Sequence, residues 1–152
     1  MKIIKMLFAT SLLASLGSFV CAGDIMVMDA YARSSGKTAK AGVAFLMIHN
    51  HTDSEDRLIA AYSDVSKMVQ LHTHEKGDDG VMKMRHVEEG FVIPAGGIHA
   101  LKRGADHIMF MGLNAPWEHG ERLEVTLAFE NAGEIKINII VDMEREEKGH
   151  DH

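Results

Sequence analysis

Cysteine is almost absent from the chain: among its 152 residues only Cys21 carries a thiol. Basic residues are also in the minority, because 16 Lys and Arg stand against 22 Asp and Glu, for a formal net charge of −6. An acidic chain offers no basic patch to nucleic acid or to anionic lipid, so neither is expected as a partner. A disulfide scaffold is excluded as well, since one cysteine has no partner in its own chain.

The chain also lacks an apolar run of the ~20 residues that a membrane span needs. The apolar stretch near the N-terminus is shorter, follows two lysines and is broken by Ser and Gly. This layout predicts a secretory signal peptide over residues 1–22, with cleavage after Ala22. Lipid attachment through Cys21 is an alternative that the bulky residues at 18–20 disfavour. We therefore expect export to a bacterial periplasm without stable insertion in the membrane.

What remains after removal of the signal peptide is rich in two residue types. The 22 residues removed hold two lysines and no acids, so the mature chain has 130 residues, a formal net charge of −8 and no cysteine. Nine methionines and all ten histidines are kept, more of each than average proteins contain. Imidazole and thioether are therefore the soft metal ligands that the mature chain can offer.

Helical periodicity over ten or more residues is missing, and so are internal repeats and a Ser/Pro-rich linker. Short runs of β-branched and aromatic residues, separated by turn signals, predict about nine strands. We expect them at 25–33, 42–50, 58–62, 67–73, 81–87, 98–102, 107–113, 122–130 and 135–142. Strands at this spacing predict an all-β fold, an antiparallel Greek-key β-sandwich over residues 23–143. Residues 144–152 (EREEKGHDH) are expected to form a charged flexible tail.

Three stretches of these strands combine His and Met at alternate positions. They are residues 71–74 (LHTH), 81–86 (VMKMRH) and 107–111 (HIMFM). Residues at i and i+2 of a strand share a face, so each stretch can present two side chains together. The loop EKGDDG makes the first two stretches hairpin neighbours, and the turn RGAD sets the third at an end of the sandwich, where sites usually form.

The chemistry of these side chains favours one ion. Neutral thioether sulfur suits Cu(I), whereas Zn²⁺ favours Cys, His or carboxylate and Mg²⁺ or Ca²⁺ require oxygen ligands. Thioethers need no deprotonation before they bind, so their affinity depends little on pH, and only the imidazoles compete with protons. We expect a neutral His/Met set to bind Cu(I) and to release it to a thiolate-bearing acceptor, which suits a carrier better than a catalyst.

A packing role competes with metal binding at most of these positions. Methionine at alternate strand positions is commonly core filler, and we interpret six methionines in this way: Met26, Met28, Met47, Met68, Met82 and Met111. We interpret five histidines as solvated or hydrogen-bonded surface residues: His49, His51, His86, His99 and His119. His150 and His152 in the tail are a weak candidate site for Cu(II).

Longer segments of the chain resemble the periplasmic copper chaperones of PCu(A)C type. The resemblance includes DAYAR, GVAFLMIHN, DRLIAAYSDVSKMVQLHTH, DGVMKMRHV, IPAGG and HIMFMGL, and so covers most of the mature chain. It implies a cupredoxin-like sandwich with a Cu(I) site made of a His, a Met about ten residues later and a His-x-Met about twenty residues after that. Carried over, the ligands are His72, Met84, His107 and Met109. Each of the two gaps is about one residue longer than the usual pattern, which leaves His74 as a possible substitute for His72.

The resemblance also implies a function. Proteins of this type supply copper for assembly of the dinuclear copper centre of cytochrome oxidase, so a partner would be the copper-bearing subunit of that enzyme or another copper-transfer protein. We therefore expect a Cu(I)-binding metallochaperone that is not an enzyme. Two alternatives stay open: a small copper redox protein, and a structural β-sandwich whose His and Met are incidental.

Overall fold

A computed structural model describes residues 24–146, and throughout this range the regular structure is β-strand. No helix in the described part of the chain could cross a membrane. The strands are β1 (Ile25–Ser34), β2 (Ala41–Asn50), β3 (Asp56–Tyr62), β4 (Ser66–Lys76), β5 (Met82–His86), β6 (Phe91–Ile93), β7 (Ile98–Leu101), β8 (His107–Leu113), β9 (Arg122–Phe129) and β10 (Gly133–Val141).

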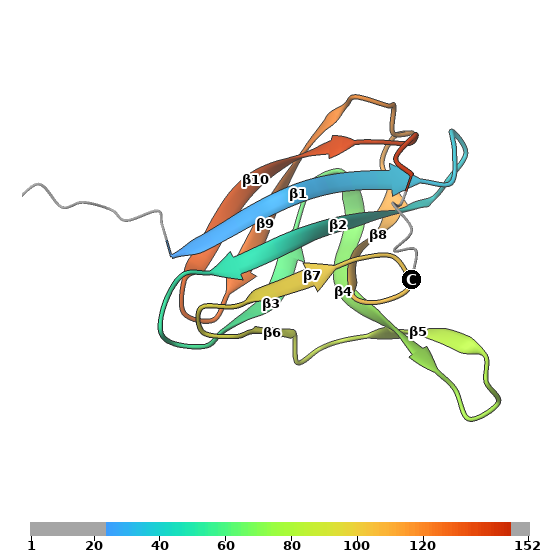
Figure 1. Cartoon of the computed structure of the whole chain (residues 1–152). Coiled ribbons are helices and arrows are strands. Elements are labelled where there is room, and N and C mark those ends of the chain that lie inside the picture. Colours follow the sequence, from blue (N-terminus) through green and yellow to red (C-terminus); the bar gives the residue numbers. More distant parts are fainter. Residues whose placement is uncertain (1–23, 147–152) are drawn as a thin grey trace, which may run out of the picture.

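The strands form one continuous sheet that curls over to make a sandwich (Figure 1). Their order is β5-β4-β8-β2-β1-β10-β9-β3-β6, and β7 adds to β2 beside β8. Neighbours that are far apart in sequence, such as β4 with β8 and β8 with β2, give the crossed connections of a Greek key. The predicted all-β, cupredoxin-like sandwich is therefore confirmed, with one difference: β1 and β10 pair in parallel.

The core follows from alternation of aliphatic residues along much of each strand. In β9, Leu123, Val125 and Leu127 are buried, whereas Arg122 before them and Glu124 between them are exposed. Side chains of successive strand residues point to opposite faces, so this pattern turns one face of β9 inward. The largest buried side chains come from six strands: Phe110, Leu46, Ile48, Leu58, Ile93, Ile108, Leu123, Leu127 and Ile139.

The hairpin of β4 and β5 projects beyond the rest of the sandwich (Figure 1). Every residue of β5 is exposed, because β5 is an edge strand that pairs with β4 alone. A tight turn sets the hairpin register: the Gly77 N–H donates to the Val81 carbonyl at 2.8 Å, and Gly80 adopts a φ of 79° that L side chains rarely reach. This turn fixes which residues of β5 lie opposite those of β4.

Methionine does not fill the core, so that interpretation is wrong. All nine methionines of the described chain are exposed or only half-buried, and about half of each of Met26, Met68 and Met82 is exposed. The reason lies in the alternation: the inward positions beside them are taken by more strongly apolar residues, such as Ile25 next to Met26. The thioethers are left on the outer faces of the sheet.

Candidate metal centre

His72 of β4 lies at the centre of the His- and Met-bearing strands. In the sheet register it is directly opposite His107 of β8 on one side and His86 of β5 on the other. Residues directly opposite in paired strands share a face and bring their Cβ atoms to ~4.5–5.5 Å. Three imidazoles from three strands therefore lie in one row. Their ring centroids are 5.8 Å apart for each pair that includes His72.

Both predicted methionine ligands are diagonal neighbours of His72. Met84 is opposite His74, two residues after His72 along β4, and Met109 is opposite Gln70, two residues before it. Diagonal neighbours in a sheet lie ~7–8 Å apart, within reach of long side chains. The structure thus brings all four predicted residues onto one face, with the two methionines on opposite sides of His72.

This face is the outer face of the sheet, yet it is not uniformly open. Leu71 and Ile108, the sequence neighbours of His72 and His107, are buried in the core. His107 is only 1% exposed although it points away from that core. Its ring is covered by His74, with ring centroids 5.0 Å apart, and by Phe45 at 6.3 Å. Met84 on the projecting hairpin is 49% exposed, so burial falls steeply across the site from β8 to β5.

Hydrogen bonds fix which nitrogen of each ring carries the proton. The carbonyl oxygen of Ala105 can only accept, so His107 Nδ1, 3.0 Å away, is the donor. Gln70 Oε1 lies 3.0 Å from His72 Nε2 and makes that nitrogen the donor in the second ring. His74 Nδ1 also approaches the Ala105 carbonyl, at 3.3 Å. The remaining nitrogens, His72 Nδ1 and His107 Nε2, keep lone pairs.

Those two lone pairs are buried, and no hydrogen-bond partner reaches them within the described residues. Burial of a polar atom without a partner destabilises the folded protein by roughly 1–3 kcal/mol, and a ligand bound to these two nitrogens would remove that cost. The ring centroids are 5.8 Å apart, a separation compatible with one ion bound to both rings through imidazole–metal bonds of ~2.0–2.1 Å. The donor set fits a soft cation.

The electrostatics of the site keep both rings neutral. Burial lowers the pKa of His72, and the nearby imidazoles of His107, His86 and His74 lower it further. The pKa of His107 is also lowered, mainly by burial, although its bond to the Ala105 carbonyl opposes the change. Neutral imidazoles and neutral thioethers together carry no charge, which suits a monovalent ion better than a divalent one. No three His, Asp or Glu side chains within residues 24–146 converge as a ready metal site, so thioethers are needed to complete one.

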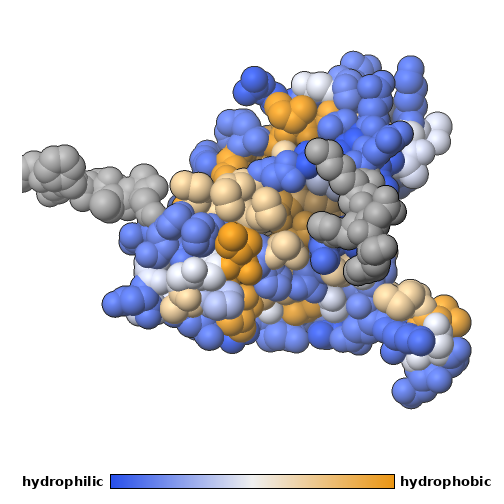
Figure 2. Space-filling model, in the orientation of Figure 1, coloured by the Kyte–Doolittle hydropathy of each residue, from blue (hydrophilic) through white to orange (hydrophobic). Residues whose placement is uncertain are grey.

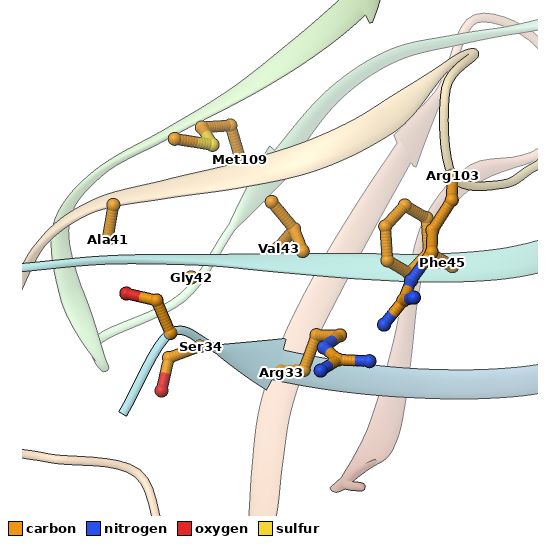
Figure 3. A pocket seen from close by; sticks show the side chains of 9 residues that line it. Arg33, Ser34, Ala41, Gly42, Val43, Phe45, Arg103 and Met109 are labelled. Carbon is orange, nitrogen blue, oxygen red and sulfur yellow. The ribbon is translucent and has the colours of Figure 1, made fainter. Parts of the chain in front are cut away.

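A pocket of about 380 Å³ opens beside Met109 on the same face. In Figure 3 the guanidinium groups of Arg33 and Arg103 lie together next to Phe45, and Met109 lies at the other end beyond Val43. Arg33 also donates to the main-chain carbonyl of Arg145 at 3.4 Å. Positive charge therefore gathers at one border of the His/Met face of an otherwise acidic chain.

Two histidines beside the site were predicted to have other roles. His86 is exposed, as expected of a surface residue, but its ring faces that of His72. His74, the possible substitute for His72, contacts His107 and the Ala105 carbonyl. The sequence signal for His86 was its two-residue spacing from Met84, which places both on one face of β5. His150 and His152 lie outside the described residues.

Two of the expected surface histidines are hydrogen-bonded, and the first residues of the expected tail contact the sandwich. His99 is hydrogen-bonded to Asp106 at 2.8 Å, and His119 Nδ1 accepts the Met143 N–H at 3.2 Å. Residues 144–146 of the expected tail are described, and Arg145 lies over the Tyr31 ring at 4.2 Å from its centroid. Its guanidinium also forms an ion pair with Asp29. This part of the segment packs against the sandwich.

Comparisons with known proteins agree with this architecture. Residues 25–141 match the profile of the family described as "LpqE-like: Putative lipoprotein LpqE-like". A relative described as "Putative lipoprotein Lxx21020", from Leifsonia xyli subsp. xyli, is 32% identical over 120 residues, which are 79% of this chain and 70% of the relative.

Solved structures share the fold. The copper-bound PCuAC domain from PmoF2 is 22% identical with a TM-score of 0.65, over 80% of this chain and 94% of that domain. The apo PCuAC domain from PmoF1 is 24% identical with a TM-score of 0.66, over 80% and 95%. The Cu(I) form of DR1885 from Deinococcus radiodurans is 26% identical with a TM-score of 0.61, over 82% and 84%. The chain belongs to the LpqE-like family, and its resemblance to the PCu(A)C type is confirmed.

Proposed function

We propose that this protein is a Cu(I) carrier whose ion is held on the outer face of β4, β5 and β8. The observation that carries the proposal is the pair of buried, unpartnered nitrogens, His72 Nδ1 and His107 Nε2, on a face that also bears thioethers. A neutral His/Met set is soft and favours Cu(I). Two of the structural neighbours are described as copper-bound or Cu(I) forms, which supports the same ion here.

The proposed ligands are His72, Met84, His107 and Met109. His72 and His107 supply the fixed pair of nitrogens, because hydrogen bonds already orient both rings. Met109 approaches from the half-buried strand β8 and Met84 from the exposed hairpin, each as a diagonal neighbour of His72. His74 and His86 would then lie beside the ligands, where their rings shield the ion from solvent or bind it in passing during transfer.

We further propose that the ion is passed to an exported acceptor, with the copper-bearing subunit of cytochrome oxidase as the partner implied by the family resemblance. A set without thiolates binds Cu(I) less strongly than cysteine ligands do, so transfer to a thiolate-bearing acceptor is downhill. Delivery takes place in the periplasm, after cleavage behind Ala22.

The catalytic alternative gains no support from the site. The His/Met face holds no cysteine for a blue-copper centre, and its titratable groups are imidazoles without a carboxylate set for acid–base chemistry among the described residues. We therefore propose a carrier and not an enzyme. A redox assay of the copper-loaded protein checks this, because sustained turnover would contradict it.

The test of the carrier site is a competition titration with the Cu(I) chelator bicinchoninate under anaerobic conditions. We expect His72→Gln to weaken the tightest Cu(I) site at least tenfold, while His119→Gln, which replaces a histidine outside the proposed ligand set, binds as the wild type does. Equal affinity of His72→Gln and wild type would overturn the proposal. Transfer is then tested by mixing the Cu(I)-loaded protein with the apo copper domain of the oxidase subunit and following formation of its dinuclear centre.

A further inference from the structure

A second group of His and Met side chains lies on β1 and β2. Met26 is directly opposite His49, and Met28 is directly opposite Met47, so these four side chains share one face of the β1–β2 pair. His51 follows His49 by two residues, just after β2 ends. The register thus gathers three thioethers and two imidazoles from two short segments. None of them belongs to the site proposed above.

These side chains point away from the core. Ile25 and Ile48, the sequence neighbours of the group, are buried, which turns the alternate residues outward. Met26 is 48% exposed, and Met28, Met47 and His49 are half-buried. Apolar residues gather over β1, β2 and β7 on the side of the molecule shown in Figure 2. Packing of the core therefore gives no reason for three methionines at these positions.

The two imidazoles are close together and available. The ring centroids of His49 and His51 are 3.8 Å apart, with 40° between the ring planes. Neither ring takes part in a hydrogen bond within residues 24–146. The main chain holds the pair in place, since the His51 N–H donates to the Asp24 carbonyl at 2.8 Å.

We propose that this group is a second Cu(I) site, formed by the imidazoles of His49 and His51 with the thioethers of Met26 and Met47. Met28 stands beside Met47 as a further sulfur. The same physical argument applies as for any neutral His/Met set, because soft donors without charge select a soft monovalent ion. Along β2, His49 is six residues from Val43, which faces Met109, so the two sites are ~20 Å apart. Occupancy of this site does not depend on the proposed carrier site.

The experiment is a titration of the full mature chain with Cu(I), followed by NMR of ¹³C-labelled methionine methyl groups. We expect the Met26 and Met47 resonances to shift and the double variant Met26→Leu/Met47→Leu to bind one Cu(I) fewer than the wild type. The matched control is Met68→Leu, which replaces a thioether of similar exposure on β4 and should leave the stoichiometry unchanged.

The two proposals fail separately in this experiment. If Met26, Met28 and Met47 do not respond while Met84 and Met109 shift, the second site is overturned and the carrier site stands. If Met84 and Met109 do not respond while Met26 and Met47 shift, the carrier site is wrong and the second site stands. An unchanged stoichiometry in Met26→Leu/Met47→Leu also overturns the second site. Met26 and Met47 lie outside the core and leucine has a similar volume, so the double variant keeps the fold and unfolding does not obscure the result.

Discussion

Leucine in place of Met84 or Met109 separates metal binding from packing. Burying a whole methionine side chain stabilises a protein by ~1.5–3 kcal/mol. Met84 is 49% exposed, so its burial contributes only about half of that free energy. Leucine has similar volume and restores nearly all of it. We therefore expect the free energy of unfolding of each variant to stay within ~0.5 kcal/mol of the wild type, a change in Tm of less than ~3 °C.

Copper binding should change far more than stability. Loss of one thioether is expected to lower the Cu(I) affinity at least tenfold, which corresponds to ~1.4 kcal/mol. The assays are thermal unfolding of the apo protein and chelator competition for Cu(I). Leu71→Ala is the contrasting variant, because Leu71 is buried on the opposite face of β4 and its truncation should cost ~2–5 kcal/mol. Folded Met84→Leu and Met109→Leu proteins with unchanged Cu(I) affinity would refute the assignment of these sulfurs as ligands.

Three further predictions concern the fold that carries the site. Gly42→Ala should destabilise the protein by ~1–3 kcal/mol in urea unfolding, because a Cβ there would lie 2.2 Å from the ring of the buried Trp117. Asp56→Ala should cost ~2–4 kcal/mol in the same assay, since the buried Asp56 carboxylate accepts three main-chain N–H bonds. The apo protein should lose stability as the pH falls below 6.5. Burial lowers the pKa of His72 and His107, so in this range the unfolded chain binds more protons than the folded protein does. The measurement is the pH dependence of Tm, which should be smaller in His72→Gln than in the wild type.

The positions of the strands were predictable wherever apolar and polar residues alternate along the sequence. The stretches around Arg122–Phe129 and His107–Leu113 alternate clearly, and their strands begin within a residue of the expected positions. Phe91–Ile93 adds a tenth strand that is too short for its pattern to be recognised. The parallel pairing of β1 with β10 was not predictable, because it joins the two ends of the described chain and depends on closure of the whole sheet.

The site was predictable in part for a similar reason. Spacing by two residues correctly placed His72 with His74, and Met84 with His86, on shared faces of β4 and β5. Which residues stand opposite one another was not predictable, since register depends on the turn at Gly77–Val81 and on the pairing of β4 with β8. The exposure of the methionines was not predictable from their hydrophobicity, because the inward face of each strand is taken by more strongly apolar residues, such as Ile25 beside Met26.

The division of each strand into two faces explains how this small sandwich can bear a metal site at its surface. In β4 and β8 the inward positions are aliphatic or aromatic, such as Leu71, Ile108 and Phe110, and they supply the stability of the fold. The outward positions are then free to carry imidazoles and thioethers without weakening the core. Across that outer face the exposure rises from His107 to Met84 on the hairpin, so in the proposed carrier an acceptor would meet the sulfur of Met84 before the buried nitrogen of His107. This gradient favours release of an ion by stepwise ligand exchange, beginning at β5 and ending at β8.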